Sequence, residues 1–452
     1  ELRERMSRAT TRAQMLRIFD ALQNSLLDLH LRFRPASSDP RRVGLPVSLT
    51  LGGSPGAWRV IVSKVPSDLS DRMTAGDIVV SIDGVETAAL LHEHRFASSF
   101  NQLRPNVQGV VRALGQRSAV LWPELIGHTA AVEVQRQAGG QRSVVELPWA
   151  VVDSQSRGLD EGLEPGLECD QVPPRAYGPY QLTAVGANVC IYTSDRKPYS
   201  RYPIVRHHGF LYEGRGGGGR RLARIDHTLI STTLAQQRKT KGVLLDLRDN
   251  HGGNNPHVFL DWWAPAPYDN TTVVVRLHQS LADRDDGSLD RMLWSTTRAN
   301  EYRARVARGE TVWAHPFLCP DEACTEGGRM TPAHPVTRAP VALMVGPWCI
   351  SSCDTFAKVF SANRFGPLVG EPTAAAYTVN RMPIELVLPG GEQLGTFELA
   401  VSRSRIGADG DWIEAVPLPI DREVPETFAN RAEHDRLMVD AAIEALGTYP
   451  RR

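Results

Sequence analysis

The stretch GVLLDLRDNHGG, residues 242–253, carries the strongest structural signal in the sequence. Its first half is an unbroken apolar run, which is typical of a strand that is buried on both faces. The run then changes to charged and polar residues and ends at Gly252 and Gly253. Glycines at such a point let the backbone turn sharply and present N–H groups to a bound atom. This stretch therefore predicts a buried strand that leads into a tight polar loop.

A second stretch, VGPWCISSCDTFA at residues 345–357, has a similar character. It follows the apolar run 341–345, and the residues from 354 to 361 have the pattern of a helix. A serine at the junction of a strand and a helix is exposed beside the free N–H groups of the helix N-terminus. Ser351 and Ser352 are therefore candidate nucleophiles, although a serine at this place can also simply cap the helix.

The surrounding region alternates between strand and helix patterns. Apolar runs predict strands at 189–192, 341–345 and 384–388, and periodic segments predict helices at 225–237 and 429–446. Strands bounded by helices argue for an α/β architecture. We therefore predict the α/β class, in the wider sense of an α+β multidomain chain, with the α/β core over residues 181–452.

The N-terminal part has a different pattern. Apolar residues recur every three or four positions in residues 1–34, so we predict a helix there, within a helical segment at 1–42. Short β-type runs follow over 43–150. Residues 151–180 are rich in proline, glycine and acids, which predicts a linker.

One piece of the β-rich part, AGDIVVSIDG at residues 75–84, resembles a segment of PDZ domains. The resemblance implies a PDZ-like domain over 43–150 with an insertion at 86–128. PDZ domains bind extended peptide ends by adding a strand to a sheet edge.

Length and charge exclude several classes of function. A chain of 452 residues exceeds one hydrophobic core, so we expect two or three domains. Basic and acidic residues are equal at 51 each, which gives no support for nucleic acid or an acidic membrane as partner. No apolar stretch of about 18 residues is present, so we expect no membrane span. The histidines and cysteines lack ligand spacing, so we predict no metal and no cofactor.

The cysteines indicate the compartment. The sequence has six, and Cys319 and Cys324 flank an acidic turn, which predicts a small closed loop. We expect an exported protein, periplasmic or secreted, with one or more disulfides. Free buried thiols in a cytosolic enzyme are the alternative.

The two opening stretches, followed by GEPT at residues 370–373, together resemble the motif set of the S41 peptidase family. This family includes the carboxyl-terminal processing, or tail-specific, proteases, the tricorn core protease and a secreted chlamydial protease. The resemblance runs over the whole chain. It implies a catalytic core of the ClpP/crotonase-like type and a serine endopeptidase that acts on protein or peptide substrates.

The resemblance also implies roles for single residues. The family's nucleophile lies three residues before the acid of its S-x-x-D/E motif, and this place is Ser351. The backbone N–H of Ser352 and that of Gly252 or Gly253 would form the oxyanion hole.

The catalytic base departs from the common pattern of the family. Ser/Lys members carry a lysine shortly after GEPT, whereas residues 374–376 here are alanines. The resemblance to the Ser-His-Glu branch instead implies His30, which stands in a D-L-H motif, and Glu414 as the acid that orients it. His207, His208 and His227 remain rival bases.

Two alternatives stay open. The same scaffold can serve as a catalytically inactive protein that binds an apolar ligand or a peptide. The resemblance to the chlamydial enzyme also raises a homodimer and a zymogen that cuts itself, with 151–180 and 280–335 as exposed candidate segments.

Overall fold

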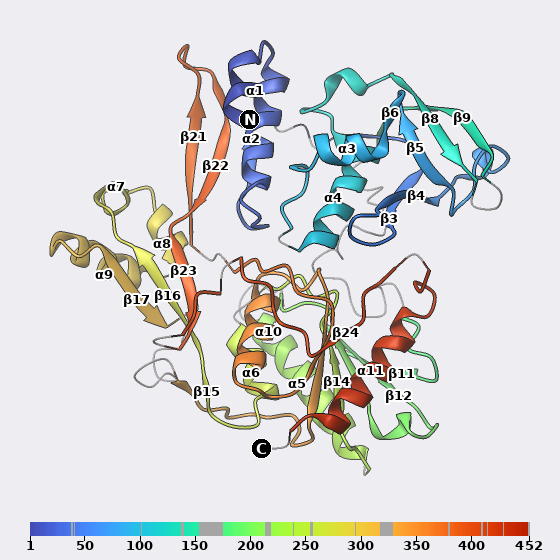
Figure 1. Ribbon diagram of the computed structural model, residues 1–452. Helices are drawn as coiled ribbons and strands as arrows, with labels where there is room; N and C mark the ends of the chain where they lie inside the picture. The colour runs from blue at the N-terminus through green and yellow to red at the C-terminus, as the bar shows by residue number, and fades with distance from the viewer. Residues whose placement is uncertain are drawn as a thin grey trace. The chain divides into compact units, whose positions relative to one another are not determined.

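The computed structural model describes the chain except residues 38, 40, 101, 137–139, 153–174, 213–217, 238, 254–255, 294, 317–328, 378–379, 408–409, 414, 428 and 451–452. The chain forms two compact units (Figure 1). Unit 1 contains residues 1–161, 383–399 and 427–429, and unit 2 contains the remainder. The architecture is mixed α/β, as predicted.

Unit 1 begins with two helices and continues into β-rich structure. Its main sheet has the strand order β3-β4-β5-β8-β9, with β6 paired to β5. Small sheets form from β10-β2-β7 and from β1-β22-β21. The elements are α1 (Leu2–Arg8), α2 (Arg12–Asn24), β1 (Phe33–Pro35), β2 (Arg42–Gly44), β3 (Ser48–Gly52), β4 (Arg59–Lys64), β5 (Ile78–Ile82), β6 (Val85–Glu86), α3 (Thr87–Glu93), α4 (Leu103–Gly115), β7 (Gln116–Ser118), β8 (Thr129–Gln135), β9 (Arg142–Pro148), β10 (Ala150–Val152), β21 (Arg381–Val387) and β22 (Gln393–Ala400).

Unit 2 is organised around a sheet of seven strands in the order β11-β12-β13-β14-β19-β20-β24. The strands from β13 to β24 run parallel. A second sheet, β17-β16-β23, and the pair β15-β18 complete the unit. The elements are β11 (Gln181–Val185), β12 (Val189–Thr193), β13 (Ile204–His207), α5 (Gly218–Gln236), β14 (Val243–Asp246), α6 (Pro256–Trp263), β15 (Tyr268–Asp269), β16 (Thr271–Arg276), α7 (Gln279–Ala282), α8 (Ser288–Leu293), α9 (Thr296–Ala307), β17 (Val312–Pro316), β18 (Arg329–Met330), β19 (Val341–Val345), α10 (Ser352–Ala362), β20 (Leu368–Gly370), β23 (Ser402–Ile406), β24 (Arg422–Glu423) and α11 (His434–Thr448).

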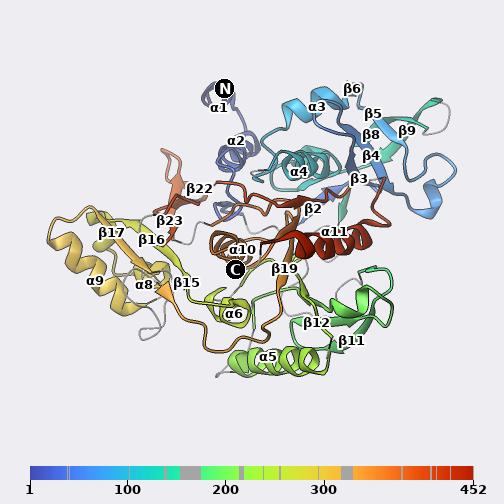
Figure 2. The same ribbon diagram turned by 60° about the horizontal axis from the view of Figure 1, so that its bottom comes forward.

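Both faces of the seven-stranded sheet are covered by helices (Figure 2). Val243 and Leu245 of β14 pack into the core that includes α5, α6 and α10. Leu244, which points to the opposite face, packs into the core that includes α11. A parallel strand buried on both faces is expected to be apolar throughout, so the pattern of residues 242–247 was a reliable signal. The strands predicted at 189–192 and 341–345 are also confirmed.

The helical structure predicted over residues 1–34 is present, but as two helices and not as one continuous run. α1 ends at Arg8, and α2 begins after Thr11. Thr11 and Gln14 form a capping box, in which the Thr11 side chain accepts a hydrogen bond from the Gln14 backbone and the Gln14 side chain accepts one from Thr11. This arrangement starts a new helix at Thr11.

The prediction of an exposed loop over 280–335 is wrong in its described part. The helices α7, α8 and α9 lie in this stretch, and β17 follows them. Leu281, Leu289 and Tyr302 are buried in a core with β16. The helices α7 and α8 were missed because each has too few turns to show a clear period. α9 is longer, but its sequence shows little apolar pattern, since Ala299 and Tyr302 are its buried residues.

Candidate active site

Ser351 lies in a sharp turn between β19 and α10, at φ 62° and ψ −121°. A positive φ is costly for a residue with a side chain and persists only where the surroundings impose it. The Ser351 side chain makes no capping hydrogen bond to α10. The hydroxyl is therefore not used as a helix cap. We call residues 346–351, which include the predicted nucleophile, the nucleophile turn.

The predicted loop at residues 248–253, called the glycine loop below, packs directly against this turn. Gly252 has φ +82°, and a Cβ atom there would lie 2.6 Å from the Ile350 carbonyl oxygen and 2.9 Å from Ser351 Cβ. Only glycine allows this close approach without displacement. The Ile350 N–H also donates to the Asn250 carbonyl at 3.2 Å. The structure thus brings together the two stretches that the sequence singled out.

The N–H groups beside Ser351 differ in their availability. The Gly252 N–H donates to Asn250 Oδ1 at 2.8 Å, and its role as an oxyanion donor stays a prediction. For the N–H groups of Ser352 and Gly253 no acceptor is found in the described part of the chain. The Ser352 hydroxyl donates to the Gly253 carbonyl at 3.1 Å and ties the turn to the loop. Ser352 and Gly253 are the N–H groups that can receive an oxyanion.

Asp354 joins the nucleophile turn to the segment after GEPT. Its carboxylate accepts from the N–H groups of Ala375 and Ala376, both at 3.1 Å. It is also hydrogen-bonded by the Ser351 backbone and the Thr373 side chain. Burial nevertheless raises the pKa of Asp354 to about 7. These contacts could not be predicted from the sequence, because the alanines donate only through their backbone.

A disulfide between Cys349 and Cys353 brackets Ser351. Both cysteines are fully buried, and the bond joins the nucleophile turn to the first turn of α10. Their spacing of four residues around the serine was a visible signal that the sequence reasoning missed. Cys190 is also disulfide-bonded, whereas the predicted pair Cys319 and Cys324 lies outside the described residues.

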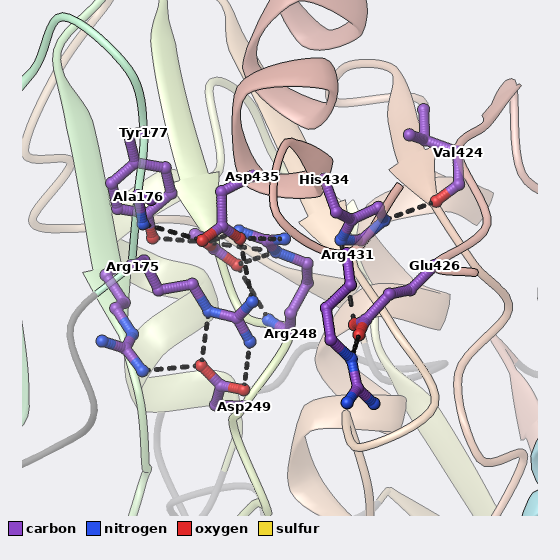
Figure 3. A network of polar contacts seen from close by, with 12 residues as sticks. Arg175, Ala176, Tyr177, Arg248, Asp249, Val424, Glu426, Arg431, His434 and Asp435 are labelled. Carbon is purple, nitrogen blue, oxygen red and sulfur yellow. Dashed lines mark hydrogen bonds and ion pairs between the residues drawn. The ribbon is translucent and has the colours of Figure 1, made fainter. Parts of the chain in front are cut away.

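A buried network of arginines and aspartates anchors the other end of the glycine loop (Figure 3). Arg175 binds Asp249 through two nitrogens and also contacts Asp435 at 2.9 Å. Arg248 bridges Asp246 at 2.6 Å and Asp435 at 2.9 Å. The complete set, called the arginine–aspartate network, is Arg175, Arg206, Arg248, Asp246, Asp249 and Asp435.

The charges of this network balance, with an equal number of cations and anions. Burial alone would raise the pKa of Asp246, but Arg248 and Arg175 lower it to about 2. Burial likewise opposes the charge of Arg248, yet its aspartate neighbours hold its pKa above the usual value. All members therefore stay charged near neutral pH and fix the polar end of β14.

The third motif, GEPT, also has a structural contact in the same unit. The Glu371 carboxylate accepts from the Glu426 N–H at 3.0 Å. Figure 3 shows Glu426 paired with Arg431, and His434 bound to the Val424 carbonyl at 2.9 Å. These contacts secure the segment before α11.

His30 belongs to unit 1, in the turn between α2 and β1. The Asp28 side chain accepts from the His30 N–H at 2.8 Å, and Asp28 Oδ1 lies 3.6 Å from His30 Nδ1. The His30 side chain is mostly buried, with 14% exposed. The D-L-H motif contains Asp28 but does not mark it as a partner of His30. The structure places the Asp28 carboxylate beside the His30 imidazole. Glu414 lies outside the described residues.

The rival bases have other surroundings. His207 is fully buried, and the Tyr212 hydroxyl lies 3.2 Å from its Nε2. Burial lowers the pKa of His207 to about 3, so it is a poor proton acceptor at neutral pH. His208 is also buried, and His227 Nε2 lies 2.9 Å from the His334 carbonyl. Burial lowers the pKa of Lys358 on α10, and Asp354 partly opposes this.

Across the described residues, no group of histidine, cysteine and acidic side chains has the arrangement of a metal site. Within the same part of the chain, no helix combines the length and the apolarity that crossing a membrane requires.

Comparison with known proteins finds one family model that matches part of the chain. Residues 226–416 match the model of peptidase family S41. Two solved structures of mature CPAF, one complexed with lactacystin, superpose with a TM-score of 0.69 at 15% identity. The first covers 98% of this chain and 92% of its own, and the second 97% and 89%. The photosystem II D1 C-terminal processing protease matches with a TM-score of 0.37 at 14% identity, over 97% of this chain and 87% of its own. No curated protein matches in sequence.

Proposed function

We propose that this chain, of which residues 226–416 match the model of peptidase family S41, is a serine endopeptidase that cleaves proteins or peptides through an acyl-enzyme, with Ser351 as nucleophile. The observation that carries the proposal is the Ser351 turn. Ser351 has a positive φ, its side chain does not cap α10, and its turn contacts Gly252. Together these features match what a nucleophilic serine requires.

In the proposed reaction His30 accepts the Ser351 hydroxyl proton while the serine oxygen attacks the substrate carbonyl. The carbonyl becomes an oxyanion, and the N–H groups of Ser352 and Gly253 stabilise it. His30 then gives the proton to the leaving amine, and the acyl-enzyme forms. Water, deprotonated by His30, resolves the ester and restores Ser351. Each proton that His30 takes is returned within the same half-reaction.

The proposal assigns the orienting acid to Glu414, and Asp28 is a second candidate. Asp28 is supported by its distance of 3.6 Å from His30 Nδ1. Glu414 is supported by the resemblance of residues 413–421 to the family motif. A carboxylate in this role fixes the imidazole tautomer and stabilises the imidazolium.

The test compares cleavage of unfolded casein by the full chain, by Ser351→Ala and by Ser361→Ala. Ser361 lies near the other end of α10 and is the matched control. We expect Ser351→Ala to lose cleavage and labelling by a serine-reactive phosphonate, and Ser361→Ala to keep both. If the unchanged chain neither cleaves nor reacts with the phosphonate, the binding protein on the same scaffold becomes the better explanation.

We also propose that the protein is exported. The disulfide at Cys349 and Cys353 and the bonded state of Cys190 support an oxidising compartment. Cell fractionation tests this, and recovery of the mature chain only with cytosolic markers would contradict it.

A further inference from the structure

Unit 1 contains a cavity of about 750 Å³ between α1, α2, the segment 92–97 and the β7 region. Five arginines line it, against three carboxylates. The arginines are Arg5, Arg17, Arg42, Arg95 and Arg117. The carboxylates are Glu1, Asp20 and Glu93, and burial raises the pKa of Asp20 to about 6. The lining therefore carries an excess of positive charge at neutral pH.

Among the described lining residues, Arg117 is a cation held by hydrogen bonds and not by an ion pair. In the described part of the chain no carboxylate lies within ion-pair distance of it. Its Nε donates to the Ala113 carbonyl at 2.8 Å, and its Nη2 lies 3.3 Å from His94 Nε2. Burial lowers the pKa of Arg117 to about 10. A largely buried cation without a counterion is expensive, so its presence requires an explanation.

Charged groups near Arg117 act on its pKa in both directions, because Glu93 and Glu124 raise it and Arg17 lowers it. The guanidinium groups of Arg17 and Arg117 lie 4.2 and 4.1 Å from the centre of the Trp122 ring. Arg17 is paired with Glu124, while Arg5 is exposed. Burial, together with Arg117, Arg5 and Arg17, lowers the pKa of His94 to about 4. His94 is therefore neutral near pH 7 and supplies a nitrogen that accepts from Arg117.

We propose that this cavity binds a small oxyanion, a phosphate or a carboxylate, held by Arg117 and Arg17 beside Trp122. Guanidinium groups bind both oxyanions through paired N–H donors, and such charge-assisted bonds are strong where water is partly excluded. The bound anion would supply the counterion that Arg117 lacks. The site belongs wholly to unit 1 and does not depend on peptidase activity.

The test measures binding of inorganic phosphate and of succinate to the full chain by calorimetry, with chloride at equal ionic strength as reference. We expect binding by the unchanged chain and by Arg59→Gln, whose exposed arginine on β4 lies outside the cavity. Arg117→Gln should weaken binding about tenfold or more, the loss expected for one charged hydrogen-bonding group. If phosphate binds more tightly than succinate, the natural ligand carries a phosphate group. If succinate binds more tightly, it carries a carboxylate.

A stability measurement separates a binding role from a purely structural one. Without phosphate, Arg117→Gln should melt at or above the temperature of the unchanged chain, because an uncompensated cation has been removed. When phosphate is added, the melting temperature should rise only for the unchanged chain and for Arg59→Gln. Arg5→Gln, a change at an exposed position, should bind several times more weakly even if Arg117→Gln does not fold. Absence of binding beyond chloride, or equal binding by all variants, would overturn the proposal.

Discussion

The turn that carries Ser351 and the turn that carries His30 are held in different ways. Ser351 is fixed by partners far along the chain, since the glycine loop lies about a hundred residues earlier and Ala375 and Ala376 follow α10. His30 is fixed by near neighbours, because Asp28 binds its N–H and the Leu31 N–H donates to the Asp28 carbonyl at 3.2 Å. The proposed nucleophile is therefore placed by the folded core, and the proposed base by a local turn.

The largest loss of activity is expected from a change in the turn that carries His30. His30→Ala should lower casein cleavage on the order of 10⁴-fold, because the proposed proton acceptor is removed. His128→Ala, a change at a half-exposed histidine of unit 1 paired with Asp83, is the matched control. Wild-type rates in His30→Ala, measured as kcat/KM, would show that the base is another residue.

The second largest loss of activity is expected from a change in the packing around Ser351. Gly252→Ala introduces a methyl group 2.6 Å from the Ile350 carbonyl, so the glycine loop must move. This movement displaces the Gly253 N–H, one of the two proposed oxyanion donors. Loss of one such donor is worth about 3 kcal/mol, so we expect kcat to fall on the order of 100-fold. Gly209→Ala is the control, since nothing lies within 4 Å of a Cβ at that position. Equal activity of both variants would show that the close approach is not needed.

A third prediction concerns pH and Asp354. Its pKa is raised to about 7 by burial, so between about pH 4 and pH 7 the native state holds a proton that the unfolded chain has released. The contribution of Asp354 to stability therefore falls as pH rises through this window. Asp354→Asn should remove this slope, a difference on the order of 2 kcal/mol between pH 5 and pH 8. Denaturant titrations of both proteins at each pH measure it, and parallel curves would contradict it.

The smallest loss of activity is expected from a change in Asp28, the acid beside His30. Asp28→Asn should lower kcat about tenfold with little change in KM, if Asp28 only helps to hold the imidazole. Glu414→Gln should cost more if Glu414 is the orienting acid. A larger loss in Asp28→Asn than in Glu414→Gln, measured as kcat over a range of pH, would reverse the assignment.

The sequence predicted the parts that depend on local pattern. The strands at 189–192 and 341–345 were clear because every side chain in them is buried. The contact between the glycine loop and the nucleophile turn followed from the family resemblance. Residue types that act through their backbone, such as Ala375 and Ala376, gave no signal for their bonds to Asp354.

Long-range charge pairs were also beyond sequence reasoning. Arg175 stands at the end of the predicted linker, and nothing near it in sequence points to Asp249 or Asp435. Arg117 is one of many arginines, and only its position in the fold shows that no carboxylate of the described residues forms an ion pair with it. In both cases the partner, or its absence, is set by tertiary structure.

The hairpin of β21 and β22 has a consequence for how this protein can be divided. Residues 383–399 belong to unit 1, although they follow most of unit 2 in the chain. β22 pairs with β1, where Phe33 faces Phe397, and both phenylalanines are buried in one cluster with Leu16. A gene fragment that stops at residue 161 would therefore encode an incomplete unit with an unpaired strand edge and exposed aromatic rings. The two units cannot be exchanged as cassettes, and recombination between relatives would have to preserve both together.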